Sequence, residues 1–315
     1  MELQQLRYVL AVAETGNFTR AAAKLFVAQP SLSQQIAKLE QELGHRLFHR
    51  LGRRAVPTEA GQVFLIRARR IMMEVDDAAK EMRDDPDGSR TITIGAVPTL
   101  APHLLPLLLQ RCRRELPNLQ VLTREGFRAD LVEAIVRGEL DLALASLPLK
   151  DHRLSIEPVF NEPLLLAVAS DHPFAKQPVV TASDLANETF VMLGDGNTLT
   201  SQIQRFCGEY DFTPRIGYRC AQVATLKALV ALGNGVAFLP EISRQGETEG
   251  GLVYRALTGR SPRREIAIIR HLQRYQSRGT ERFLTLARSE LKSRWPAERL
   301  APDDEGAVPP VVPVD

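Results

Sequence analysis

Residues 29–44, QPSLSQQIAKLEQELG, decide the fold of the N-terminal part of the chain. Apolar residues recur there at steps of four, three and four, at Leu32, Ile36, Leu39 and Leu43. This spacing predicts a helix with one buried stripe. Its opposite face carries Ser31, Ser33, Gln34, Gln35 and Lys38. Serine and glutamine both donate and accept hydrogen bonds, and lysine reaches phosphate or guanine, so this face suits a DNA major groove.

The flanking segments complete a winged helix-turn-helix pattern. A first helix with an apolar face ends at Gly16, and Asn17 is a good N-cap for an alanine-rich second helix over Phe18–Phe26. A short break then leads to Pro30, where the third helix begins. Residues 45–57 predict a β-hairpin with Gly52 at its turn. Its arginines would lie along the DNA backbone, as in a wing.

The charge is unevenly distributed. The whole chain has a formal net charge of +2, but residues 1–70 contain eleven basic and five acidic side chains, about +6. Residues 71–90 are acidic. A basic head is the electrostatic signature expected for binding phosphates. A generic three-helix bundle with a basic surface is the alternative for this segment.

A long helix is expected after Thr58, because no proline follows until Pro86. Apolar residues recur along it as a heptad seam, at Phe64, Ala68, Ile71, Val75, Ala78 and Met82. Such a seam favours pairing with a second copy, which would place two heads on one duplex about one helical turn or a multiple apart. The alternative is a helix that packs on its own domain. Residues 84–89 predict a hinge.

Residues 90–297 alternate between strand and helix patterns. Strands are expected at 91–95, 119–122, 141–145, 164–168, 190–192, 235–239 and 265–269, and helices at 104–114, 131–137 and 280–294. This order predicts an α/β body with helices on both faces of the sheet. Because the chain builds a second α/β lobe and then returns, we expect lobe I at 90–162 and 266–297, lobe II at 163–265, and a ligand cleft between them. The tail, residues 298–315, is expected to be disordered.

The head closely resembles the LysR family of transcription regulators. The resemblance rests on FTRAA at 18–22, QPSLS at 29–33, Leu39-Glu40, Leu43-Gly44, Leu47-Phe48, Arg50 and TEAG at 58–61. It implies a winged helix-turn-helix domain over 1–58, a dimerising linker helix and hinge over 59–89, and an effector domain with the periplasmic-binding-protein fold over 90–297. The recognition helix would span Pro30 to Glu42.

The expected partners follow from the resemblance. They are double-stranded DNA, a second copy of the chain in a dimer or tetramer, RNA polymerase as a further candidate, and a small-molecule or redox effector. The residues expected at the DNA are Phe18, Thr19, Arg20, Gln29, Pro30, Ser31, Ser33, Gln34, Gln35, Lys38, Arg50, Arg53 and Arg54.

Effector residues are expected at the ends of strands in the body. Thr99 follows the first body strand and is expected to cap the next helix, and Arg128 follows the second. A capped helix beside a solvated arginine is the alternative. The full set of expected effector residues is Thr99, Leu100, Arg128, Asn197, Thr198, Cys207 and Gln222.

The second lobe resembles the peroxide-sensing OxyR branch of the family. That resemblance implies a peroxidatic cysteine and a resolving cysteine nine residues later, but this chain has Thr198 at the first position and Cys207 at the second. Threonine cannot form a sulfenic acid, so a conventional disulfide mechanism is not expected. Cys207 could act alone or with Cys220 if Arg205 or Arg219 stabilised its thiolate. The alternative is a buried structural cysteine.

Other classes of protein are disfavoured by what the sequence lacks. It has no phosphate-binding Gly-x-x-x-x-Gly-Lys run, no dinucleotide glycine fingerprint and no Gly-x-Ser-x-Gly elbow, so neither an enzyme nor a cofactor is expected. His45 and His49 lack further ligands, and no metal is expected. A solute-binding protein is a second rival, against which stand the basic head and a start without a secretion signal. Three scattered cysteines and no membrane-length apolar run favour the cytoplasm and give no membrane partner.

Overall fold

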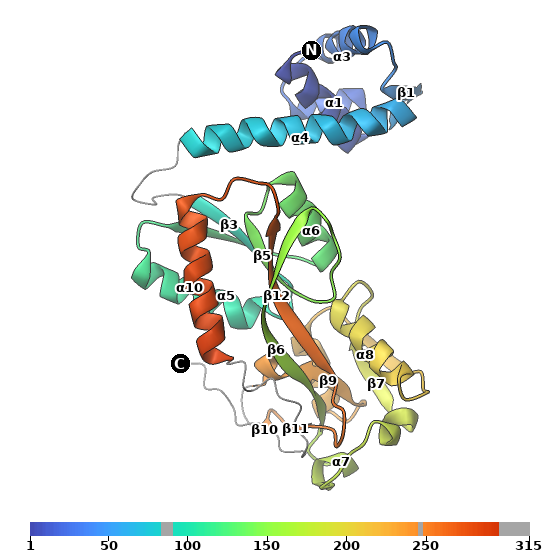
Figure 1. Ribbon diagram of the computed structural model, residues 1–315. Helices are drawn as coiled ribbons and strands as arrows, with labels where there is room; N and C mark the ends of the chain where they lie inside the picture. The colour runs from blue at the N-terminus through green and yellow to red at the C-terminus, as the bar shows by residue number, and fades with distance from the viewer. Residues whose placement is uncertain (83–90, 245–247, 296–315) are drawn as a thin grey trace. The chain divides into compact units, whose positions relative to one another are not determined.

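The computed structural model describes residues 1–82, 91–244 and 248–295. The chain forms two compact units, residues 1–84 and 85–315, and each is described by itself. Figure 1 shows the first unit in blue to cyan and the second in green to red. The hinge expected at 84–89 and the tail expected at 298–315 lie outside the described residues.

Unit 1 contains the elements of a winged helix-turn-helix. Its elements are α1 (Leu3–Thr15), α2 (Phe18–Lys24), α3 (Gln29–Leu43), β1 (Phe48–Leu51), β2 (Arg54–Pro57) and α4 (Glu59–Met82). Gly16 and Gly44 end α1 and α3 in the left-handed conformation, at φ 62° and 70°, which glycine adopts without steric cost. Strands β1 and β2 pair antiparallel, with Leu51 opposite Arg54 at the turn. The expected helix order and hairpin are therefore present.

The core of unit 1 forms around the apolar stripe of α3. Leu32, Ile36 and Leu39 are fully buried. They share one cluster with residues of α1, α2 and the hairpin, among them Val9, Val12, Ala21, Ala22 and Phe48. The small alanines of α2 let the neighbouring helices approach closely. Burial of the stripe fixes the orientation of α3, and it leaves the polar side of that helix facing outward.

Helix α4 is packed on its own unit along its first half. Leu6 of α1 forms a cluster with Ala68 and Met72, and Phe64 packs against the same cluster. Two of the expected seam residues, Phe64 and Ala68, thus contact α1, so for them the alternative of packing within the domain is correct. The exposed large apolar side chains of α4 are Val63, Ile66, Ile71 and Met82, and of these Ile71 and Met82 belong to the expected seam.

Unit 2 is built on one large mixed sheet. Its strands are β3 (Thr91–Ala96), β4 (Gln120–Glu125), β5 (Leu142–Ser146), β6 (Leu154–Ala169), β7 (Thr189–Leu193), β8 (Arg215–Cys220), β9 (Ala237–Pro240), β10 (Thr248–Glu249), β11 (Leu252–Arg255) and β12 (Arg263–His271). The large sheet runs β10-β11-β6-β12-β5-β3-β4, with β9 also pairing with β6, and β7 and β8 form a separate pair. Pairs β3–β4, β3–β5 and β7–β8 are parallel.

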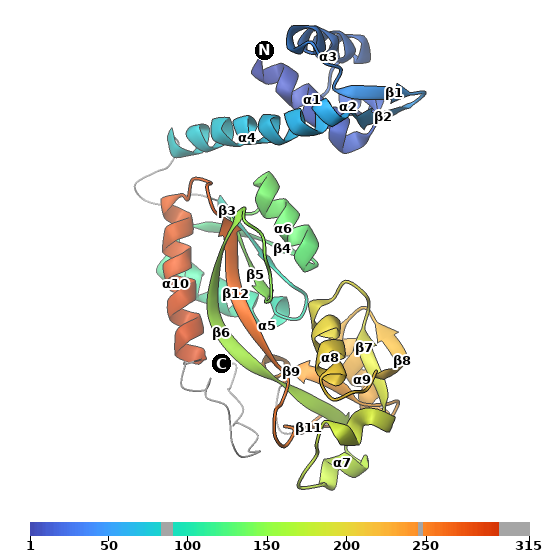
Figure 2. The ribbon, with the colours of Figure 1, turned by 45° about the vertical axis from the view of Figure 1, so that its right-hand side comes forward.

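The helices of unit 2 cover both faces of this sheet. They are α5 (Ala101–Glu115), α6 (Arg128–Arg137), α7 (Pro173–Lys176), α8 (Thr198–Gly208), α9 (Val223–Ala231) and α10 (Arg278–Arg294), with short 3-10 turns η1 (Ser183–Asn187) and η2 (Glu241–Ser243). Figures 1 and 2 show α5 and α10 on one side of the sheet and α6 on the other. The expected α/β architecture is confirmed.

Two separate hydrophobic cores lie within unit 2. One draws on residues 92–160 and 266–295, which we call lobe I, and the other on residues 164–257, which we call lobe II. Strand β6 contributes to both cores because it runs unbroken for 16 residues, whereas the sequence pattern predicted only its second half. Figure 2 shows β6 and β12 passing side by side from one lobe to the other. These two strands connect the lobes.

Candidate DNA-binding face and effector cleft

The outer side of α3 divides into a free part and an anchored part. Ser31, Gln34 and Lys38 are exposed, and none of them makes a side-chain hydrogen bond within the described part of the chain. Ser33 and Gln35 are half-buried and have partners inside the unit. Ser33 Oγ accepts from Arg50 Nη1 at 3.1 Å, and Gln35 Oε1 accepts from Gln5 Nε2 at 3.3 Å. The free part is therefore narrower than the expected reading face.

The N-terminal end of α3 is open to an anion. Its N-cap, Ala28, has no side chain that could accept from the first amides of the helix, and Pro30 lies in the first turn. Gln29 is half-buried and Pro30 is exposed. Unsatisfied amides at the positive end of a helix dipole attract phosphate. The turn before α3 presents Phe26, which is 96% exposed at φ 56°.

The hairpin is fixed to the helices by short polar contacts. Asn17 caps α2 through Oδ1, and its Nδ2 donates to the Arg53 carbonyl at 2.6 Å. The Arg50 guanidinium lies over the Phe18 ring, 4.6 Å from its centroid, while it donates to Ser33. Phe18 in turn meets Phe48 edge to face at 5.9 Å. Hairpin, α2 and α3 therefore present one rigid surface.

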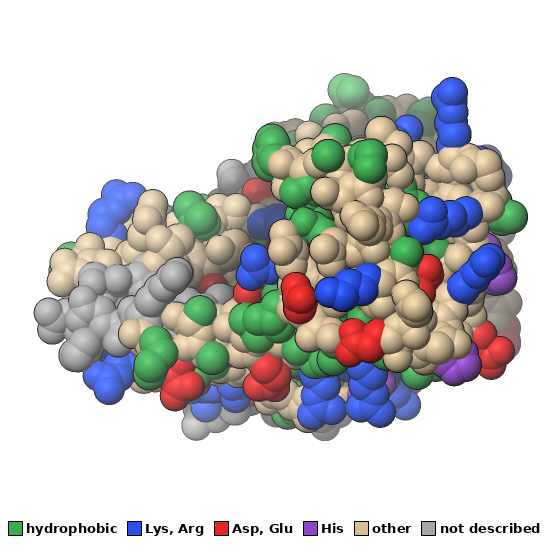
Figure 3. Space-filling model, turned by 90° about the horizontal axis from the view of Figure 1, so that it is seen from above, with side chains coloured by type: hydrophobic (Ala, Val, Ile, Leu, Met, Phe, Trp, Pro, Cys, Tyr) green, Lys and Arg blue, Asp and Glu red, His purple; other side chains and the backbone are tan. Residues whose placement is uncertain are grey.

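Most of the remaining expected DNA residues lie exposed around this surface. Thr19 and Arg20 are exposed in the first turn of α2, and Arg53 and Arg54 at the turn of the hairpin. Figure 3 shows Lys and Arg side chains, in blue, gathered around the hairpin end of the unit. The structure thus brings cationic side chains beside the polar part of α3.

A small cavity in unit 2 lies at the carboxyl ends of three neighbouring parallel strands. It has a volume of 10 Å³, about the space needed by one water molecule. Its lining comes from the loops after β3, β4 and β5 and from the start of α8: Val97, Pro98, Thr99, Phe127, Arg128, Ser146, Gly196, Asn197 and Thr198. We call it the cleft cavity. Strand ends of this kind are where α/β sheets bind ligands.

The Thr99 hydroxyl contacts a buried ion pair and does not cap α5. The N-cap of α5 is Leu100, without a side-chain cap bond, so the expected cap is wrong. The Thr99 hydroxyl lies 2.7 Å from Arg264 Nη1. Arg264 also contacts Glu162 Oε1 through Nε at 2.8 Å and Nη2 at 2.7 Å. The other carboxylate oxygen accepts from the Ile242 amide at 2.8 Å.

This network links the cleft cavity to the strands that connect the lobes. Arg264 and Glu162 are 1% and 0% exposed and lie on β12 and β6. Buried charges need full pairing, which these residues have. Sequence reasoning missed both, because the three members are separated by 102 and 165 residues along the chain.

Arg128 and Asn197 shape the cleft cavity through bonds to backbone groups. Arg128 Nη1 donates to the carbonyls of Ser146 and Pro148, at 3.1 and 2.7 Å, so this arginine is not simply solvated. Burial lowers the pKa of its guanidinium. Asn197 caps α8 through the Leu199 amide at 3.0 Å, and Thr198 is the first residue of that helix.

Three of the expected effector residues, Leu100, Cys207 and Gln222, do not line this cavity. Leu100 is fully buried in the core of lobe I. Gln222 is exposed at the start of α9 and is not among the lining residues. The structure adds lining residues that the sequence did not single out, Val97, Pro98, Phe127, Ser146 and Gly196.

The surroundings of Cys207 disfavour the reactive thiolate form of its side chain. It is fully buried in the core of lobe II, and burial raises the pKa of its thiol to about 12. Arg219 pairs with Asp195 at 2.7 Å. Burial also raises the pKa of Cys112 and of Cys220, and all three cysteines are free thiols. Since the thiolate is the reactive form, the burial of Cys207 favours the alternative of a structural cysteine.

Within residues 1–82, 91–244 and 248–295, no three His, Cys, Asp or Glu side chains gather as metal ligands would. In the same ranges no helix combines the length and apolarity needed to cross a bilayer.

Comparison with known proteins gives two family matches that follow one another along the chain. The family described as bacterial regulatory helix-turn-helix protein, lysR family, matches residues 3–62, and the LysR substrate binding domain matches residues 87–292. The DNA-binding transcriptional dual regulator OxyR of Escherichia coli K12 is 36% identical over 273 residues, covering 85% of this chain and 89% of that protein.

Solved structures give the same picture. A full-length OxyR variant from Pseudomonas aeruginosa superposes with a TM-score of 0.70 at 25% identity, covering 93% of this chain and 95% of that one. An OxyR mutant of Corynebacterium glutamicum bound to H2O2 superposes with a TM-score of 0.61 at 27% identity, with 93% of each chain covered.

Proposed function

This chain belongs to the LysR family of DNA-binding transcription regulators, and from that premise we propose which of its surfaces carry the function. The exposed side chains Ser31, Gln34 and Lys38 of α3 contact base edges and phosphate in the major groove. The observation that carries the proposal is that these three polar groups are exposed, without a side-chain partner among residues 1–82, 91–244 and 248–295, on a helix whose opposite stripe is fully buried. Groove readers of the helix-turn-helix class use this part of the recognition helix.

The surroundings of α3 supply the contacts to the DNA backbone. The open N-terminus of α3, Gln29 and Pro30 beside it, and the arginines of the hairpin contact phosphates on either side of the groove. Ser33 and Gln35, which are also expected at the DNA, additionally orient the hairpin and α1 around α3 through their bonds to Arg50 and Gln5. They thereby help to position the reading face.

A second copy of the chain completes the DNA-binding unit. The exposed apolar side chains Val63, Ile66 and Ile71 on α4 support pairing along this helix, since burying them against a partner is favourable. Pairing sets the spacing of two half-sites on one face of the duplex. We further propose assembly to a tetramer, contact with RNA polymerase at activated promoters, a cytoplasmic location and no catalytic activity of its own.

The effector domain binds its signal at the cleft cavity. A volume of 10 Å³ suits a molecule of very few atoms. Thr99, Arg128, Asn197 and Thr198 supply hydroxyl, guanidinium and amide groups there, which suits a small polar ligand. Reduction of a peroxide by a thiolate is not proposed, because Thr198 replaces the cysteine that such chemistry needs and Cys207 is buried in the core of lobe II.

A binding measurement over a range of salt concentrations tests the proposal. Full-length protein is titrated into a labelled duplex from its own upstream region and into a random duplex of equal length. The affinity should fall with salt in both cases, because phosphate contacts release counterions, while the specific duplex keeps an advantage of at least about a thousandfold. Equal affinity for both duplexes at every salt concentration would refute sequence reading by α3.

A further inference from the structure

A second and much larger cavity lies between the lobes of unit 2. It has a volume of 750 Å³, the size of a small-molecule site. Lobe I and the connecting strands provide Leu147, Pro148, Leu149, Lys150, Asn161, Arg263 and Glu265, and lobe II and the segment before β12 provide Gln202, Arg205, Phe206, Glu209, Arg260, Ser261 and Pro262. We call it the α8 cavity. None of these residues lines the cleft cavity.

The electrostatics of the α8 cavity favour an anion. Its lining contains four basic residues and two acidic ones. Arg260 is neutralised by Glu209 at 2.9 Å. Lys150 and Arg205 are both exposed, and neither has an ion pair or side-chain hydrogen bond among the residues that the structure describes. Lys150 of lobe I and Arg205 of lobe II are therefore both available to bind the carboxylate of a ligand.

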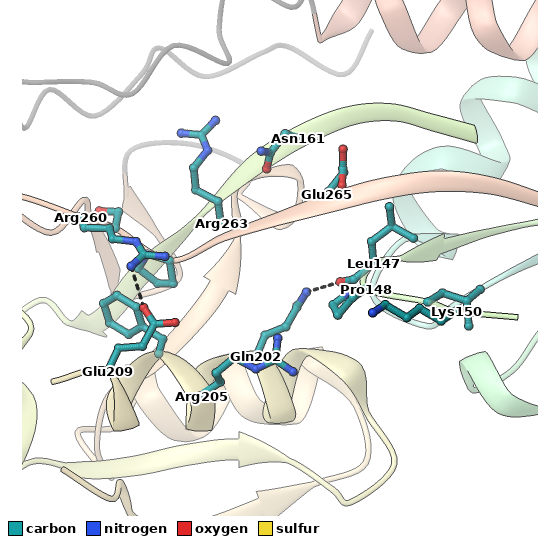
Figure 4. Close-up of a pocket in the computed structure, with 14 residues that line it drawn as sticks. Leu147, Pro148, Lys150, Asn161, Gln202, Arg205, Glu209, Arg260, Arg263 and Glu265 are labelled. Carbon is teal, nitrogen blue, oxygen red and sulfur yellow. Dashed lines mark hydrogen bonds and ion pairs between the residues drawn. The ribbon is translucent and has the colours of Figure 1, made fainter. Parts of the chain in front are cut away.

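The α8 cavity also contains hydrogen-bond acceptors that a ligand with donor groups would satisfy. Asn161 Oδ1 and Gln202 Oε1 are buried and have no hydrogen-bond partner within the described residues. An unsatisfied buried acceptor is costly, and a ligand hydroxyl would satisfy it. Figure 4 shows Gln202 and Arg205 on α8, with Gln202 directed toward Leu147, Asn161 on the strand across the cavity and Lys150 at one end.

The apolar part of the lining limits the ligand to a compact carbon skeleton. Leu147 and Leu149 are half-buried and Phe206 is 5% exposed, so the cavity has an apolar wall beside its charged and polar groups. From charge, acceptors and wall together, we propose that the α8 cavity binds a small hydroxylated carboxylate. Its carboxylate contacts Lys150 and Arg205, and its hydroxyl groups donate to Asn161 and Gln202.

Helix α8 connects this site to the cleft cavity. Its N-cap Asn197 and first residue Thr198 line the cleft cavity, while Gln202, Arg205 and Glu209 line the α8 cavity at helical spacing. Gln202 Nε2 also donates to the Leu147 carbonyl at 2.8 Å, which ties α8 to lobe I. A ligand that reorients Gln202 therefore acts on the start of the same helix. This regulatory role rests on the proposed function, whereas binding itself does not.

Calorimetry on the full-length protein tests the proposal. Malate and citrate serve as hydroxylated carboxylates, and succinate is the matched probe because it differs from malate by one hydroxyl. We expect malate or citrate to bind with a dissociation constant below about 1 mM. Succinate should bind at least about tenfold more weakly than malate, since it leaves a buried acceptor unpaired. Failure of both hydroxylated acids to bind, or equal binding of malate and succinate, would overturn the proposal.

Two variants locate the binding. The double substitution Lys150→Gln and Arg205→Gln should weaken malate binding at least about tenfold. The control Arg113→Gln removes an exposed charge of α5 outside the cavity and should leave it unchanged. Unchanged binding in the double variant would place malate elsewhere and refute the site. The calorimetry contains no DNA. A failure of malate binding is therefore distinguishable from a failure of sequence-specific DNA binding, which is measured separately.

Discussion

Replacing Thr99 by valine tests the buried network that connects the cleft cavity to the lobes. Valine keeps the shape of threonine but removes the oxygen that lies 2.7 Å from Arg264 Nη1. Because Arg264 is 1% exposed, the freed N–H has no access to bulk water. The substitution therefore removes the hydrogen bond between Thr99 and Arg264 but leaves the ion pair between Arg264 and Glu162 intact. A buried donor of this kind left unsatisfied costs about 2 kcal/mol.

This loss is measurable with the tryptophan of unit 2. Trp295 is the single tryptophan of the sequence, is 6% exposed and stacks on Phe160 with ring centroids 4.5 Å apart. Its fluorescence therefore reports the unfolding of lobe I. For a unit of this size, 2 kcal/mol lowers the melting temperature by about 4–8 °C.

The matched control is Thr99→Ser, which keeps the hydroxyl and should melt within about 2 °C of the parent protein. A Thr99→Val variant as stable as the parent would refute the inference that this hydroxyl satisfies Arg264. A Thr99→Ser variant as unstable as Thr99→Val would show that the hydroxyl alone does not account for the contribution of Thr99, because serine keeps the hydroxyl and loses only the methyl group.

Three further outcomes follow from particular contacts. Gly61→Ala should destabilise unit 1 by about 3 kcal/mol in urea unfolding, because a Cβ there would lie 2.0 Å from the Leu47 carbonyl oxygen; unchanged stability would contradict that contact. The hydrogen bond from Arg153 lowers the pKa of Asp151 to about 2, so its contribution to stability is complete above about pH 4 and is lost as the pH falls toward 2. Asp151→Asn should flatten the acid limb of the stability profile, and an unaltered limb would rule this pair out. At pH 7 a thiol with a pKa of about 12 is ionised in about one molecule in 100,000, so limited peroxide should leave Cys207 unmodified by mass spectrometry, and a sulfenic acid there would contradict its burial.

The sequence predicted the head well because its signals are local. The stripe of α3, the glycine ends of α1 and α3 and the cap at Asn17 each depend on neighbours within a few residues, and all are present. The same applies to the hairpin turn at Gly52. The seam on α4 was harder to predict, because spacing identifies an apolar face but not which partner covers it. Two of the six seam residues, Phe64 and Ala68, are covered by α1.

The effector domain was predicted less completely because its site is assembled from distant segments. Glu162 and Arg264 lie just before the strands predicted at 164–168 and 265–269, and only the longer β6 and β12 of the fold bring them together as a pair in the interior. Leu100 adjoins Thr99 in sequence but points into the core. The α8 cavity joins residues from 147 to 265, and no local motif marks it.

Substitution of Gln34 is the sharpest test of whether the exposed side of α3 reads base edges. Gln41 is exposed on the same helix but lies in its C-terminal half, so Gln41→Ala is the matched control. Anisotropy titrations should show Gln34→Ala losing about 1–3 kcal/mol on the specific duplex and nothing on a random duplex, with Gln41→Ala unchanged on both. An equal loss by Gln34→Ala on both duplexes, or an equal effect of Gln41→Ala, would contradict base reading by α3.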